Sequence, residues 1–152
     1  MQLFDWQIEF ETGNALLDDQ HRLLIDKVND CNKATRREDV SSETLITLIE
    51  DVQLSVANHF REEEELLLTL GLADEFHLSQ HARMVNHLTK QIDIFKLGNQ
   101  NKSFVFSRIL FPFYDWYLCH LLDTDSTVKG HLHSPPPSRR EYLGSPMEQW
   151  LP

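Results

Sequence analysis

Glycine and proline are almost absent from most of this chain. Residues 14–125 hold two glycines, Gly71 and Gly98, and a single proline, Pro112. Because these two residue types interrupt regular structure most strongly, such a stretch is expected to consist of long elements joined by few turns. Five of the six prolines lie instead in the last 18 residues. The pattern predicts one domain of long elements followed by a segment of different character.

Apolar residues recur at helical spacing in four segments, and no alternating pattern typical of strands competes with that spacing. Each stripe is broad enough to face the core of a bundle. Polar residues at 37–42, Gly71 and the loop at 98–103 separate the segments, and Ser41 or Ser42 can cap the second helix. Short connections between four helices predict an all-α, up-down-up-down antiparallel four-helix bundle. The stripes span 17–31, 45–70, 77–95 and 109–121.

Three features modify this simple bundle. Residues 1–17 are expected to form an N-terminal arm that docks through Phe4, Trp6, Ile8 and Phe10. Pro112 removes a hydrogen bond from the fourth helix, so a kink or an opened turn is expected there. Residues 126–152 are expected to be a Pro-rich, flexible C-terminal extension, which leaves residues 1–125 as the working domain.

Composition and charge exclude several classes of partner. The 152 residues suit one domain. Their formal net charge of −10 argues against binding to nucleic acid or to an anionic membrane surface. No apolar run approaches the length of a membrane span. Two cysteines, Cys31 and Cys119, are too few for a disulfide framework, which predicts a reducing, cytoplasmic location.

Metal-capable side chains occupy positions on the apolar stripes where hydrophobic residues are expected. Two pairs of them are separated by four residues, one helical turn. A single histidine on an apolar face is more often a hydrogen-bonded core residue than a ligand. Burying so many polar groups without partners would cost about 1–3 kcal/mol each, against a total stability of about 5–15 kcal/mol. Metal coordination removes that cost, and the candidate ligands are His21, His59, Glu63, His77, His81, His120 and Asp125.

The types of ligand favour iron. Seven protein ligands exceed the four of a zinc site and suit two six-coordinate ions. A set of five imidazoles and two carboxylates favours iron over calcium or magnesium, which prefer oxygen ligands.

The local sequence around these ligands resembles the hemerythrin family, in its single-domain bacterial form (bacteriohemerythrin). The resemblance covers about residues 4–125 and includes all seven ligand positions with the family's local spacings. The matching motifs are Thr12-Gly13-Asn14, Asp18-Asp19-Gln20-His21, His59-Phe60-Arg61-Glu62-Glu63, His77-Leu78-Ser79-Gln80-His81 and Trp116-Tyr117-Leu118-Cys119-His120 followed by Asp125.

This resemblance implies a centre of two non-haem iron ions joined by an oxo or hydroxo bridge. It assigns one iron to His77, His81 and His120 and the other to His21 and His59, with Glu63 and Asp125 bridging the two. Dioxygen would bind reversibly at the open position of the two-histidine iron. The candidate walls of the ligand pocket lie within one turn of a ligand, and ordinary core packing explains them equally well; they are Leu24, Phe60, Trp116, Tyr117 and Leu121.

One spacing does not fit a regular helix. Asp125 follows His120 by five residues, which places the two side chains about 140° apart around an ideal α-helix. We therefore expect the helix to fray or widen near Leu122–Asp125 so that Asp125 can turn inward.

The resulting hypothesis is an oxygen-binding protein for carriage, storage or local supply, rather than an enzyme. Alternatives are an oxygen or redox sensor that signals to a partner protein, and an enzyme acting on peroxide or nitric oxide. The C-terminal extension is either disordered or a docking segment that uses Tyr142 and Trp150. Of the remaining residues, Glu62, Glu64 and Glu65 are expected on a solvated face, His87 at the surface, and both cysteines in packing roles.

Overall fold

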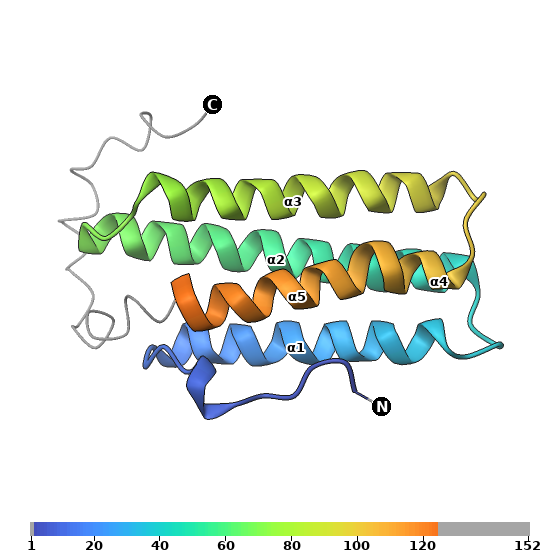
Figure 1. Cartoon of the computed structure of the whole chain (residues 1–152), viewed down its shortest axis with the longest axis horizontal. Coiled ribbons are helices and arrows are strands. Elements are labelled where there is room, and N and C mark those ends of the chain that lie inside the picture. Colours follow the sequence, from blue (N-terminus) through green and yellow to red (C-terminus); the bar gives the residue numbers. More distant parts are fainter. Residues whose placement is uncertain (1, 125–152) are drawn as a thin grey trace.

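The computed structural model describes residues 2–124, and this part of the chain is an antiparallel bundle of four helical rods with no strand (Figure 1). The predicted all-α, up-down-up-down bundle is thereby confirmed. Asp125 and the C-terminal extension lie outside the described residues. A short 3-10 turn, η1 (Ile8–Phe10), precedes three long helices, α1 (Ala15–Thr35), α2 (Ser42–Leu70) and α3 (Glu75–Lys96). The fourth rod runs through α4 (Lys102–Phe104), the π-helix η2 (Val105–Leu110), α5 (Phe111–Cys119) and the π-helix η3 (His120–Thr124).

Side-chain caps start the long helices at defined residues. The Asn14 side chain accepts hydrogen bonds from the backbone N–H groups of Leu16 and Leu17, so α1 begins at Ala15 and the arm ends at residue 14 rather than 17. Ser41 caps α2, and Asp74 caps α3 by accepting from a backbone N–H. Gly71 ends α2 with a φ of 68°, a left-handed conformation that glycine adopts without strain.

The N-terminal arm packs along α1 as expected, with one exception. Phe4 and Phe10 are buried in the main core. Asn29 fixes the arm by accepting from the backbone N–H of Phe4 at 2.9 Å and donating to its carbonyl at 2.7 Å. Trp6 lies beneath the Arg22 guanidinium, 4.4 Å from the ring centroid. Ile8 does not dock, because its side chain is 66% exposed.

The fourth rod is irregular around Pro112, as the sequence predicts. The π-helix η2 precedes the proline, which lies in the first turn of α5. A proline at 112 cannot donate to the carbonyl of residue 108. His87 of α3 lies 3.0 Å from that Arg108 carbonyl through Nε2 and donates to it. His87 is therefore not merely a surface residue, because it links α3 to the fourth rod.

No helix in the described part of the chain is long and apolar enough to cross a membrane.

The two cysteines differ in accessibility, which gives a first prediction. Cys31 is buried and its burial raises the pKa of the thiol to about 12, whereas Cys119 is exposed, contrary to its expected packing role. At neutral pH a thiol reagent should therefore modify Cys119 rapidly and leave Cys31 unmodified until the protein unfolds. Counting modified thiols by mass spectrometry tests this expectation. The Cys119→Ser variant should lose the fast reaction. Fast modification of Cys31 in the folded protein would contradict the prediction.

Candidate metal centre

Six of the seven predicted ligands lie together at one end of the bundle. The antiparallel topology places the first turns of α1 and α3 beside the last turns of α2 and the end of the fourth rod (Figure 1). Each side chain comes from the core-facing stripe of its helix, and each is at most 2% exposed. These six residues are His21, His59, Glu63, His77, His81 and His120.

The imidazoles form two groups whose Nε2 atoms converge. In the first group, the Nε2 atom of His81 lies 3.1 Å from that of His77 and 2.9 Å from that of His120. These three residues and Glu63 each offer one ligand atom, and the four atoms lie within 4.8 Å of one another. In the second group, the Nε2 atoms of His21 and His59 are 3.0 Å apart.

Glu63 lies between the two groups. Its Oε1 atom is 3.7 Å from Nε2 of His77, and its Oε2 atom is 3.5 Å from Nε2 of His81. The same Oε2 atom is 3.7 Å from Nε2 of His59, which belongs to the second group. One buried carboxylate therefore faces donor atoms of both groups.

Polar side chains on neighbouring helices orient the imidazoles. His59 donates from Nδ1 to Oε1 of Gln20 at 2.9 Å, and His120 donates from Nδ1 to Oε1 of Gln80 at 3.2 Å. His81 donates from Nδ1 to the Glu64 carboxylate at 2.8 Å. In neutral imidazole a proton on Nδ1 leaves a lone pair on Nε2. All three rings therefore direct lone pairs into the interior.

This arrangement fits a metal ion. The Nε2 atoms of His81 and His120 lie 2.9 Å apart, and a cation bound to both lone pairs would offset their repulsion. Two nitrogens bound to one ion, with bonds of about 2.1 Å, are about 3.0–3.4 Å apart. The three Nε2 separations of 2.9–3.1 Å are close to those of two nitrogens that bind one metal ion.

The orienting residues were missed by the sequence analysis. Gln20 and Gln80 each precede a candidate ligand but contact a histidine on another helix, so spacing along one helix does not reveal them. Glu64 was expected on a solvated face, yet it is half-buried, and its burial raises the pKa of the carboxyl to about 7. Glu62 likewise contacts the Gln20 amide. The sequence feature that could have indicated them is a polar residue directly before a candidate ligand, as in Gln20-His21 and Gln80-His81.

Removing one of these orienting groups should weaken metal binding without unfolding the bundle. We expect Gln80→Ala to lower metal affinity by about 10–100-fold, because the His120 ring loses the acceptor that fixes its orientation. Isothermal titration of the metal-free protein with ferrous or cobaltous ion measures this change. Gln91→Ala, on the same helix but away from the candidate ligands, is the matched control. Equal affinity in both variants would show that Gln80 does not orient a ligand.

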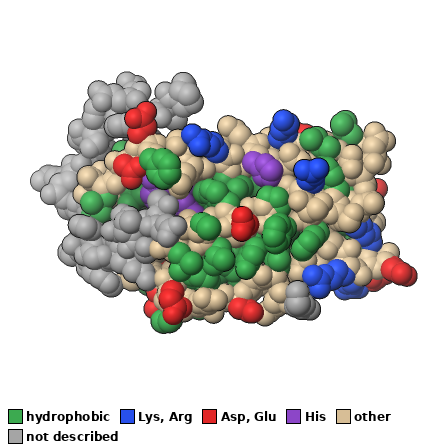
Figure 2. Space-filling model, in the orientation of Figure 1, with side chains coloured by type: hydrophobic (Ala, Val, Ile, Leu, Met, Phe, Trp, Pro, Cys, Tyr) green, Lys and Arg blue, Asp and Glu red, His purple; other side chains and the backbone are tan. Residues whose placement is uncertain are grey.

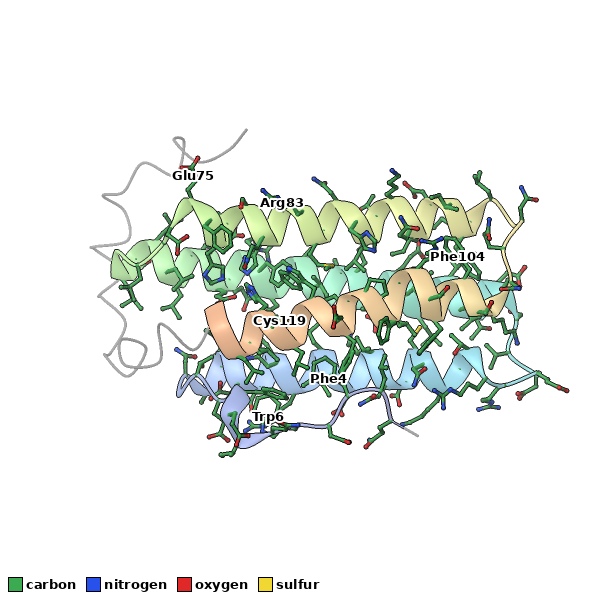
Figure 3. The ribbon with its side chains drawn as sticks, viewed as in Figure 1. Phe4, Trp6, Glu75, Arg83, Phe104 and Cys119 are labelled. Carbon is green, nitrogen blue, oxygen red and sulfur yellow. The ribbon has the colours of Figure 1, made fainter. Side chains whose placement is uncertain are left out.

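Aromatic rings cover the imidazoles. Phe60 stacks on His81 with a centroid distance of 3.8 Å and an angle of 1° between the rings, and Trp116 stacks on His120 at 4.5 Å. Tyr117 approaches His21 with its ring edge, at 6.0 Å. The two aliphatic candidates for the pocket wall, Leu24 and Leu121, are each 1% exposed. These buried apolar side chains, which belong to the packing between the helices drawn in Figure 3, should limit the access of water to the imidazoles.

The expected widening of the fourth helix occurs where the described chain ends. The π-helix η3 covers His120–Thr124. Because a π-turn closes hydrogen bonds between residues five apart, it places such residues one turn above each other. The assignment of Asp125 as a bridging ligand lies outside the described residues and stays a prediction.

Comparisons with known proteins support the fold. No family model and no curated protein matches this chain. A solved crystal structure of a leucine-to-phenylalanine mutant superposes with a TM-score of 0.77 and 23% sequence identity. The match covers 88% of this chain and all of that one. The fold and the site therefore define a four-helix bundle with a buried histidine and glutamate cluster that could hold a metal ion.

Proposed function

We propose that this chain binds dioxygen reversibly at a di-iron centre, as a carrier, store or local supplier of oxygen. The observation that supports the proposal is the position of Glu63 between two groups of converging imidazole nitrogens. A carboxylate in that position can bridge two ions. His77, His81 and His120 would hold one iron and His21 and His59 the other, as the hemerythrin resemblance implies.

The set of ligands distinguishes the two iron positions. Three imidazoles serve one group and two serve the other, so the two-histidine side has room for an external ligand. Iron bound there would supply an open, redox-active coordination position for dioxygen. An imidazole-rich set also carries little negative charge, which disfavours high oxidation states of iron and so favours release over further reaction.

The chain's own residues would keep the reaction reversible by excluding water. Phe60 and Trp116 stack on two of the imidazoles, and Tyr117 borders the two-histidine group. An apolar surrounding slows the delivery of protons and the loss of a reduced oxygen species. The neutral Nδ1–H donors hold the rings in place, so the ligands need little reorganisation when the oxidation state changes.

Optical spectroscopy tests the proposal. The reduced, iron-loaded protein is exposed to oxygen and then degassed, while metal analysis gives the number of irons per chain. A visible charge-transfer band that appears with oxygen and disappears on degassing is expected. Immediate conversion to a stable oxidised form would overturn reversible binding and favour the sensor or enzyme alternatives. Failure to bind iron at all would overturn the di-iron centre itself.

A further inference from the structure

Helix α5 carries apolar residues on the side that faces away from the core, around one exposed carboxylate, Asp115. Its inner side carries Phe113 and Tyr117, both at most 1% exposed. The opposite side continues into η3 and has the helical spacing 111, 114, 118 and 122. There Phe111 is 47% and Leu122 is 40% exposed. We call the set Phe111, Tyr114, Leu118 and Leu122 the outer face of α5; Tyr114 and Leu118 are partly buried and also pack against the main core.

The outer face belongs to a larger apolar area. Figure 2 shows hydrophobic side chains gathered over the front of the molecule, where α5 lies in Figure 1. Exposed apolar area of this kind marks a surface that contacts another element or another molecule.

The chain itself supplies a segment that can reach this surface. Residues 125–152 follow directly from Thr124, at the end of the outer face. The face from residue 111 to residue 124 is about 20 Å long at 1.5 Å per residue. About seven extended residues cover that length, so a segment of 28 residues returns along the whole helix with chain to spare.

The chemistry of this segment complements the outer face. It carries Tyr142, Leu143, Trp150 and Leu151, yet it is too short to bury them in a core of its own. Its three basic residues balance its three acidic residues, so the formal charge of −10 resides entirely on residues 1–124. A second copy of the bundle would therefore be repelled, whereas the Arg139-Arg140 pair is attracted to the bundle.

We propose that residues 125–152 dock on the outer face of α5 and cover it within the same molecule. The proposal commits to the chain's own segment because tethering gives it a high effective concentration at this surface. It does not depend on the metal centre, so the failure of either proposal leaves the other intact.

Limited trypsin digestion of the full chain tests the docking. The rate of cleavage after Arg139 and Arg140 is followed by mass spectrometry. We expect Phe111→Glu and Leu122→Glu each to speed this cleavage by about tenfold relative to the unchanged protein, because the segment is released from protection. The control is Leu54→Glu, at an apolar position of α2 that is 61% exposed. This variant should be cleaved after Arg139 and Arg140 at the same rate as the unchanged protein. Circular dichroism confirms that each variant keeps its helices.

Two outcomes would overturn the proposal. In the first, the unchanged protein is cleaved as fast as both outer-face variants and as fast as a synthetic peptide of residues 126–152. In the second, sedimentation shows a dimer that Phe111→Glu dissociates but deletion of residues 131–152 does not, which assigns the face to a second copy.

Discussion

Glu63→Gln should leave the bundle folded but deprive it of the pair of metal ions proposed for it. The substitution preserves size and removes the charge from the carboxylate that, among residues 2–124, faces both groups of imidazoles. We expect metal affinity to fall by more than about 100-fold, since losing a proposed direct ligand should cost more than losing an orienting residue. Metal content after loading and desalting, together with titration of the metal-free protein, measures the loss.

The same substitution should not lower the stability of the metal-free protein, and it should raise that stability if the buried charge is costly. The Glu63 side chain is fully buried, and a buried carboxylate costs free energy unless a cation compensates it. The glutamine variant should therefore unfold at the same temperature as the metal-free original or higher. The original should gain stability on adding metal, because a ligand that binds only the folded state stabilises it. The variant should lose most of that gain.

Glu65→Gln provides the control for this prediction. Glu65 lies two residues further along α2 and belongs to neither group of ligand atoms. It should keep the full metal content and the full stabilisation by metal. Retention of two ions per chain by Glu63→Gln, or identical behaviour of the two variants, would refute the role assigned to Glu63.

The helices and the inward orientation of the histidines could be predicted because both follow from the regular spacing of apolar residues along the sequence. A histidine on an apolar stripe must face the core, and antiparallel neighbours with short connections must bring the start of one helix beside the end of the next. The proline at 112 likewise signals an irregularity at its own position. These features depend on residues close in sequence, which is why spacing alone recovers them.

Contacts between helices could not be predicted in the same way. Gln80 reaches His120 across 40 positions, and His87 reaches the Arg108 carbonyl across 21. These contacts depend on the relative rotation of the helices, which the apolar stripe fixes only coarsely. The exposure of Ile8 and Cys119 has the same origin, because each lies at the edge of an apolar pattern.

Phe60 and Phe95 provide a matched pair that separates packing from the chemistry of the site. Both rings are buried in the main core, at 2% and 3% exposure. Phe60 stacks on His81, whereas Phe95 lies 14 residues further along α3 than His81, about 21 Å along the helix axis, and stacks on Phe104. Replacing either by alanine should destabilise the bundle by about 3–5 kcal/mol through the lost contacts and the cavity left behind.

Only the Phe60→Ala variant should alter the proposed reaction with oxygen. A cavity beside His81 admits water to the imidazoles, so the oxygen-bound state should decay to the oxidised form about tenfold faster than in Phe95→Ala. Thermal unfolding establishes that the two variants are equally destabilised, and stopped-flow absorbance measures the decay. Because the two variants lose the same stability, faster decay of the oxygen-bound state in Phe60→Ala would show that the Phe60 ring excludes water from the imidazoles. Equal decay rates would mean that the aromatic cover over His81 contributes packing energy alone.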